Sequence, residues 1–182
     1  MIKNISKNMH PSQKNTKILE KEIVYEATRS TGPGGQHRNR VATAIRATHK
    51  PTGIFAMGTE RRSQLENKKQ ALFRLRCKLA MTHRSPIKSE NLCEPTLYQP
   101  SELWLKRLKG RKIKASPTHT DFPALLAEVL DRLQIDKDDV KNTAIAFRVS
   151  TTQLIKFLAI DGHTLHALNK RREAQKLKPF KI

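Results

Sequence analysis

The sequence predicts an α+β protein: a small three- to four-stranded sheet packed on one helix with a projecting glycine-rich loop, followed by an all-α C-terminal region. Three observations support this class. Short segments with a period of two flank a Gly/Pro cluster near Gly32. One long amphipathic segment starts near Ser63, and from about residue 101 the apolar spacing is helical. The 182 residues suffice for one domain or two small ones.

The first twenty residues are rich in Lys, Asn and Ser and carry no acid before Glu20. This composition predicts a basic flexible tail over residues 1–20. An organelle transit peptide is the alternative, and the lack of arginine in this stretch argues against it.

A compact domain is predicted over residues 21–82, and it begins with three strands. Residues 22–28 place Ile23, Tyr25 and Ala27 on one side, and residues 41–48 alternate in the same way. Residues 50–53 (KPTG) have the signature of a type I turn, so residues 54–57 return as a third strand.

A helix follows these strands in the same predicted domain. Ser63 and Glu66 form a capping box that opens a helix to about Ala80. Its expected apolar stripe consists of Leu65, Leu72, Leu75 and Leu79.

Prolines 86, 95 and 100 punctuate residues 83–100, which we expect to be a linker, and a helical domain is predicted over residues 101–175. Ser101 is expected to cap its first helix, and residues 111–114 to form a basic connection. Four further N-caps precede apolar periodic runs. They are Asp121, Asp136, Ser150 and Asp161.

Residues 136–158 have a helix-turn-helix-like pattern, with Thr151, Thr152 and Gln153 at the start of the second helix. Binding to DNA, docking on RNA and purely structural packing are all compatible with it. Residues 176–182 form a predicted basic tail, for which a solvated surface is the alternative.

The net charge of +20 points to a polyanionic partner, with nucleic acid ahead of a membrane surface. Residues 1–85 hold 18 Lys and Arg against 5 Asp and Glu, so the excess is concentrated there. No apolar run is long enough to span a bilayer, and no signal-peptide core is visible. Cys77 and Cys93 fit no metal-binding spacing. We therefore expect a cytoplasmic protein without a metal, a cofactor or a membrane partner.

The loop at residues 30–37 (STGPGGQH) is the most informative segment. Its three glycines allow positive φ and close approach to another molecule, while Pro33 limits the entropy lost on ordering. The spacing matches neither G-x-x-x-x-G-K-[ST] nor G-x-G-x-x-G, so a nucleotide-binding loop is disfavoured. An ordinary turn is the simplest alternative.

Three motifs occur in order: residues 29–39 (RSTGPGGQHRN), 44–54 (AIRATHKPTGI) and 62–68 (RSQLENK). Together they resemble the catalytic domain of class I peptide chain release factors, and more closely the codon-independent release-factor-like proteins that rescue stalled ribosomes. Arg38 departs from the small apolar residue usual in that family and adds a cation. The chain has neither the P-x-T nor the S-P-F tripeptide by which full release factors read stop codons.

The resemblance implies a peptidyl-tRNA hydrolase acting within the ribosome, with peptidyl-tRNA as substrate and the large-subunit peptidyl transferase centre and ribosomal RNA as partners. It implies a monomer. Gly34, Gly35 and Gln36 would be catalytic, with the backbone N–H of Gln36 facing the developing oxyanion. A basic C-terminal tail would sense a vacant messenger channel. The residues expected to bind RNA are Arg29, Arg38, Arg40, Lys68, Lys69, Lys170, Arg171, Arg172, Lys176 and Lys178.

The alternative function is a non-catalytic protein that binds ribosomal RNA or DNA through its basic helical region. In that case the glycine-rich loop would be inactive.

Overall fold

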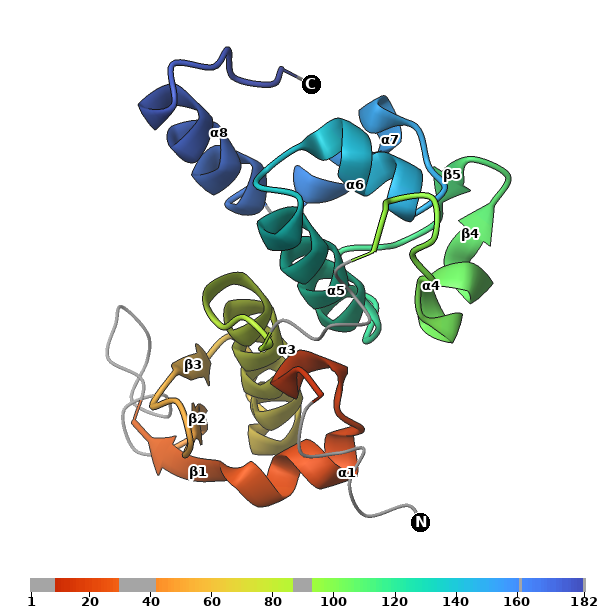
Figure 1. The fold of residues 1–182 in the computed structure, drawn as a ribbon. Helices are drawn as coiled ribbons and strands as arrows, with labels where there is room; N and C mark the ends of the chain where they lie inside the picture. The colour runs from red at the N-terminus through yellow and green to blue at the C-terminus, as the bar shows by residue number, and fades with distance from the viewer. Residues whose placement is uncertain (1–8, 30–41, 87–92, 161, 182) are drawn as a thin grey trace. The chain divides into compact units, whose positions relative to one another are not determined.

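The computed structural model describes residues 9–29, 42–86, 93–160 and 162–181. Two compact units, Met1–His83 and Arg84–Ile182, make up the chain, and each is described by itself (Figure 1). The first contains a three-stranded sheet and a long helix, and the second is mainly helical. The predicted α+β class is confirmed.

The sheet of the first unit is antiparallel and has the order β1-β2-β3. Its strands are β1 (Ile23–Thr28), β2 (Ala44–His49) and β3 (Phe55–Gly58). The predicted hairpin joins β2 to β3: the backbone N–H of Gly53 donates to the carbonyl oxygen of His49 at 2.8 Å, and Gly53 has φ +67°. Glycine adopts this left-handed conformation without the steric cost that a side chain brings.

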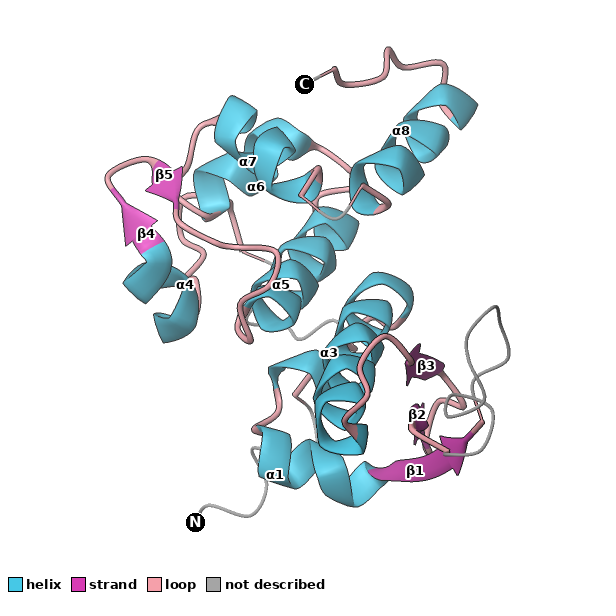
Figure 2. Cartoon of the chain, turned by 180° about the vertical axis from the view of Figure 1, so that it is seen from behind, coloured by secondary structure: helices cyan, strands magenta, loops and turns pink. Residues whose placement is uncertain are grey.

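Helix α3 (Gln64–Thr82) packs on this sheet (Figure 2). Its predicted cap is present, since the Oγ of Ser63 accepts from the backbone N–H of Glu66 at 3.4 Å. Leu65 is 63% exposed, so its assignment to the apolar stripe was wrong. The buried face instead starts at Asn67, which lies roughly 200° around the helix from Leu65. The core cluster comprises Leu19, Ile23, Ile45, Ala47, Ala56, Ala71, Leu75 and Leu79.

Strand β3 approaches α3 most closely at Gly58. A Cβ added there would overlap the carbonyl oxygen of Asn67 and lie 2.9 Å from its carbonyl carbon and 3.0 Å from the backbone nitrogen of Ala71. Because all three atoms belong to the helix backbone, they cannot move aside as a flexible side chain could. Glycine at this position therefore sets the distance between strand and helix.

The segment before β1 is packed rather than free, so the expectation of a flexible tail fails from His10 onward. It contains η2 (Pro11–Gln13), α1 (Thr16–Leu19) and η3 (Glu20–Glu22). The Oγ of Ser12 donates to the carbonyl oxygen of Arg76 at 2.7 Å, and the Arg76 guanidinium donates back to the carbonyl oxygen of Ser12 at 2.8 Å. The anchors are single side chains in short turns, which produce no periodic sequence pattern.

Glu22 connects this segment to the hairpin. Its carboxylate accepts from the Nζ of Lys14 at 2.6 Å and lies 3.2 Å from the Nε2 of His49, which is buried. Partial burial raises the pKa of Glu22, but the hydrogen bonds and positive charge of Lys14 and His49 outweigh it. The net result is a pKa below the ordinary value of 4.5.

The second unit contains five helices and a short hairpin among its described residues: α4 (Glu102–Arg107), β4 (Leu108–Lys109), β5 (Lys112–Ile113), α5 (Phe122–Ile135), α6 (Val140–Ala146), α7 (Thr151–Leu158) and α8 (Thr164–Ala174). The expectation of an all-α region with a plain basic connection was wrong at residues 108–113. Gly110 has φ +57° at the first turn position, which permits the tight two-residue turn of a hairpin.

Aromatic side chains fill the centre of this unit. The ring of Trp104 lies 4.5 Å from that of Phe147 and 5.5 Å from that of Phe157, and its Nε1–H donates to the carbonyl oxygen of Phe147 at 3.0 Å. Tyr98 packs edge-on against Phe147 at 5.3 Å. Residues 93–100, expected to be part of a linker, therefore contribute to this core.

Two of the four predicted caps differ in the structure. Ser150 caps α7 as expected, accepting from the backbone N–H of Gln153 at 3.2 Å. Asp121 precedes α5, but its carboxylate accepts from Arg107 instead of capping the helix. Asp136 ends α5, and Asp139 caps α6. Asp161 lies outside the described residues.

We predict that Gly58→Ala lowers the free energy of unfolding of the first unit by about 2 kcal/mol or more, since overpacking against a rigid neighbour typically costs about 1–3 kcal/mol. Urea denaturation measures the change. Gly53→Asn is the matched control, because its site is open and Asn tolerates positive φ. Equal losses for the two variants would contradict the tight contact.

We predict that Glu22→Gln is less stable than the wild type at neutral pH and that the difference shrinks as the pH falls. A carboxyl whose pKa is depressed on folding stabilises the fold above its unfolded pKa, near 4.5. That contribution disappears as the pH falls through the folded pKa. Urea titrations of both proteins from neutral pH to below pH 4.5 check this, and a constant difference would contradict it.

Candidate catalytic and RNA-binding site

The predicted catalytic residues Gly34, Gly35 and Gln36 and the predicted RNA-binding residues Arg38 and Arg40 lie outside the described residues. The structure describes the two stems that connect to them. Arg29 follows β1 directly and is exposed, and Ala42 and Thr43 lead into β2. Thr28 at the end of β1 pairs with Ala44 at the start of β2. The sheet therefore holds the two stems side by side.

Asn67 binds the second stem from within α3. Its Nδ2 donates to the carbonyl oxygens of Thr43 at 2.7 Å and Arg61 at 2.8 Å, while its Oδ1 accepts from the backbone N–H of Arg61 at 2.9 Å. The residue is fully buried. One amide group thus joins the entrance of β2 to the turn between β3 and α3.

Gln64 adds a weaker contact one turn earlier, where its Nε2 donates to the carbonyl oxygen of Ala42 at 3.2 Å from an exposed position. Both amides lie in the third sequence motif, residues 62–68, where neither was predicted to have a role. The sequence did contain a signal for Asn67, since residues 67, 71 and 75 lie on one face of the helix and Ala71 and Leu75 are apolar. A polar side chain on such a buried face needs hydrogen-bond partners, which would have indicated a structural role.

Three described cations of the first unit were predicted to bind RNA. Arg29 and Lys69 are exposed. Lys68 is half-buried: its Nζ lies 4.4 Å from the centre of the Tyr25 ring and 3.9 Å from the Oε1 of Glu20. Burial, followed by the charge and hydrogen bond of Glu20, raises the pKa of Tyr25 to about 12. The ammonium group of Lys68 thus already has two contacts within the unit, one with the Tyr25 ring and one with Glu20.

The five predicted cations at the C-terminal end are not equivalent. Lys170, Lys176 and Lys178 are exposed. The guanidinium of Arg171 donates to both carboxylate oxygens of Asp138, from Nε at 2.7 Å and Nη2 at 2.9 Å. Arg172 donates to the carbonyl oxygen of Lys178 at 3.0 Å.

The segment after α8 folds back on the helix. The side-chain amide of Asn169 donates to the carbonyl oxygen of Phe180 at 2.9 Å and accepts from its N–H at 2.8 Å. The guanidinium carbon of Arg172 lies 4.0 Å from the centre of the Phe180 ring. A tail that reaches into a channel must first open these contacts.

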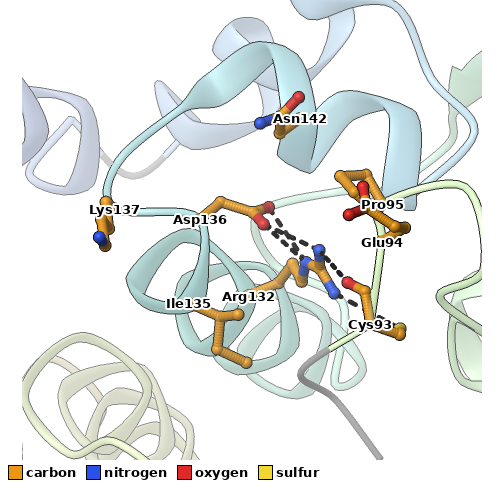
Figure 3. A pocket seen from close by; sticks show the side chains of 8 residues that line it. All are labelled: Cys93, Glu94, Pro95, Arg132, Ile135, Asp136, Lys137 and Asn142. Atoms are coloured by element: carbon orange, nitrogen blue, oxygen red, sulfur yellow. Dashed lines mark hydrogen bonds and ion pairs between the residues drawn. The ribbon is translucent and has the colours of Figure 1, made fainter.

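The second unit has a cavity of about 310 Å³ next to α5 (Figure 3), and no predicted site residue lines it. Arg132 and Asp136, both nearly inaccessible, form an ion pair with an Nη2–Oδ1 distance of 2.8 Å. Arg132 also donates to the carbonyl oxygen of Cys93 at 3.1 Å, and Thr143 donates to Asp136 at 2.8 Å. These polar groups join residue 93, α5 and α6, so we regard the pair as structural.

Within the described ranges, no three His, Cys, Asp or Glu side chains are grouped so as to hold a metal ion. Across the same ranges, no helix combines the length and the apolar character that crossing a membrane requires.

Comparison with known proteins finds a family whose matched region includes all three sequence motifs. Residues 12–100 match the RF-1 domain family. The chain is 52% identical over 62 residues to the chloroplastic peptide chain release factor PrfB1 of Arabidopsis thaliana, covering 34% of this chain and 14% of that protein. It is 40% identical over 73 residues to peptide chain release factor 1 of Symbiobacterium thermophilum, covering 40% of this chain and 20% of the relative.

A third relative, peptide chain release factor 2 of Helicobacter pylori, is 48% identical over 62 residues, 34% of this chain and 17% of that protein. The resemblance to the GGQ-containing domain of class I release factors is thus confirmed, with residues 12–100 matching the RF-1 domain family. The chain spans only about a seventh to a fifth of the length of these curated relatives.

We predict that Asn67→Ala lowers the free energy of unfolding by about 3 kcal/mol, because it removes three partly buried hydrogen bonds to backbone groups of Thr43 and Arg61, and an unsatisfied group costs about 1–3 kcal/mol where it is buried. Asn67→Asp should cost at least as much at neutral pH, since it turns a carboxylate toward two carbonyl oxygens. Urea denaturation measures both.

Gln64→Ala is the control, because it removes one exposed hydrogen bond and should change stability by no more than about 0.5 kcal/mol. A loss at Asn67 no larger than the loss at Gln64 would contradict the role of the buried amide.

Proposed function

We propose that this protein hydrolyses the ester bond of peptidyl-tRNA on the ribosome and that it does so without reading a stop codon. The observation that carries the proposal is the RF-1 domain match over residues 12–100, which includes the Gly34-Gly35-Gln36 loop. The described residues around the loop support it, because paired strands and a buried amide fix both stems of a catalytic loop to a rigid scaffold.

The proposed chemistry relies on position and on a backbone donor. Water attacks the ester carbonyl, and the backbone N–H of Gln36 stabilises the negative charge that develops on the carbonyl oxygen. Gly34 and Gly35 let the main chain approach RNA closely. The Gln36 side chain admits water and excludes larger nucleophiles. Proton transfer is left to the tRNA and ribosomal RNA.

Basic side chains would hold the domain on ribosomal RNA. Arg29 and Lys69 are exposed near the loop stem and on α3, and Lys68 keeps its ammonium at the edge of the unit over Tyr25. Arg38 and Arg40 belong to the loop itself. At the other end of the chain, the exposed lysines among the predicted cations would contact RNA, and they are Lys170, Lys176 and Lys178.

Independence from the stop codon is proposed because the sequence contains neither recognition tripeptide. The test is a peptide-release assay on purified ribosomes that carry peptidyl-tRNA, with either a stop codon, a sense codon or no codon in the A site. We expect release in the absence of a stop codon. Release that occurs only with a stop codon would overturn the codon-independent function, and no release at all would favour the non-catalytic alternative.

We predict a graded effect of loop substitutions on the release rate. Gly35→Ala should slow release more than Gln36→Ala, which keeps the backbone N–H. Gln36→Pro deletes that N–H and should raise the activation barrier by about 2.7–4 kcal/mol, as the loss of an oxyanion donor does. Single-turnover release measures all three, with ribosome binding as the control. Equal, mild effects would argue against a backbone donor.

A further inference from the structure

We propose that the β4–β5 hairpin and helix α7 form a second RNA-binding surface, on the second unit, that takes the phosphate backbone of double-helical RNA. The choice of RNA rests on the proposed function. The surface itself rests on charge, exposure and strand register in residues 84–182.

Charge in the second unit is segregated along the chain. Residues 103–120 contain six Lys and Arg and no Asp or Glu. One of the six, Arg107, is committed within the unit, because its guanidinium donates to Asp121 and lies against His119. The other five are Lys106, Lys109, Arg111, Lys112 and Lys114, of which Lys106 has a distant ion pair with Glu102 at 3.9 Å. All five are exposed or nearly so.

The hairpin brings like charges together. Lys109 on β4 is the direct cross-strand partner of Lys112 on β5, and Arg111 occupies the turn between them. Directly opposed residues of an antiparallel pair point to the same face with Cβ atoms about 5 Å apart, and like charges there are destabilising. A hairpin with two residues per strand has little stability to spare. A phosphate bound beside Lys109 and Lys112 would be attracted to both side chains and would offset their mutual repulsion.

Helix α7 extends the basic surface. It packs against β5, and both views of the fold show the two as neighbours (Figures 1 and 2). Residues 140–160, which contain α6 and α7, carry three basic residues and no acid. Thr152 and Lys156 on α7 are exposed. Exposed hydroxyl and ammonium groups are the side chains that contact phosphate and sugar oxygens.

The tight turn before α7 is well defined even though it lacks glycine. Arg148 takes the left-handed conformation at φ +56°, and its guanidinium donates to the Oε1 of Gln99 at 3.1 Å. The backbone N–H of Val149 donates to the carbonyl oxygen of Ala144 at 3.0 Å. These hydrogen bonds hold the turn, and with it the start of α7, in one position. A surface that docks on a rigid duplex needs such a fixed position.

Aromatic residues indicate a duplex rather than a single strand. Proteins that bind single strands stack bases on exposed aromatic rings. The second unit has six aromatic residues. Trp104, Phe122, Phe147 and Phe157 are buried. Tyr98 packs on Phe147, and Phe180 lies under Arg172. None of the six rings is therefore free to stack on an RNA base. Binding must depend instead on contacts to the sugar-phosphate backbone of the RNA, as in the recognition of double-stranded RNA.

The test measures fluorescence anisotropy of a labelled blunt-ended RNA duplex with the full-length protein over a series of salt concentrations. The variant is K109Q/R111Q/K112Q. The matched control, K17Q/K50Q/K137Q, removes three exposed lysines outside this surface. Each lost phosphate contact reduces the slope of log K against log salt by roughly 0.7–0.9, so the hairpin variant should lose about 2–3 from the slope.

We expect the control to retain more of the slope than the hairpin variant, and we expect the wild type to bind the RNA duplex more tightly than a DNA duplex of the same sequence. Slopes that fall equally in variant and control would overturn the hairpin surface. Tighter binding to DNA, or to a single strand, would overturn the choice of partner.

The release assay separates this inference from the proposed function. Duplex binding that depends on the hairpin, together with no peptide release by the wild type, would leave the surface standing and reject the hydrolase. If the wild type releases peptide and the hairpin variant binds the duplex as well as the wild type does, the proposed hydrolase would stand and the hairpin surface would be rejected. Circular dichroism of the variant checks that it is folded.

Discussion

The contact between Gly58 and the backbone of α3 at Asn67 is the constraint on which the first unit depends. The absence of a side chain at Gly58 lets strand β3 lie against the helix backbone. At this distance the side chain of Asn67 can reach Thr43 on one side and both backbone groups of Arg61 on the other. One packing distance therefore sets both the core and the position of the strand that the glycine-rich loop enters.

The elements that the sequence predicted well are those whose signals are local. The period-two segments became β1, β2 and β3, and the Ser63 cap opened α3, because pleat and capping depend on residues a few positions apart. The failures have nonlocal causes. Leu65 lies outside the core because Asn67, not a leucine, faces the sheet. Ser12 contacts α3, and His10 contacts His83 at the end of that helix, so both are buried by residues more than sixty positions away in the chain.

The candidate site was predictable in its chemistry and less so in its geometry. Residue types identify the glycine-rich loop and the basic residues, but counting charges does not show which are engaged. Arg171 is held by Asp138, Arg172 lies over Phe180, and Lys68 lies over Tyr25. The hairpin at Gly110 was missed because two residues per strand leave no alternation to detect.

The two units have separate interiors. The core of the first is built from residues between Leu19 and Leu79, and the aromatic core of the second from residues between Tyr98 and Phe157. Substitutions in one interior thus need no compensating change in the other. A unit with a self-contained interior can be inherited next to different neighbours without redesign. The aromatic interior of the second unit can then vary in sequence without disturbing the packing of β1, β2 and β3 on α3.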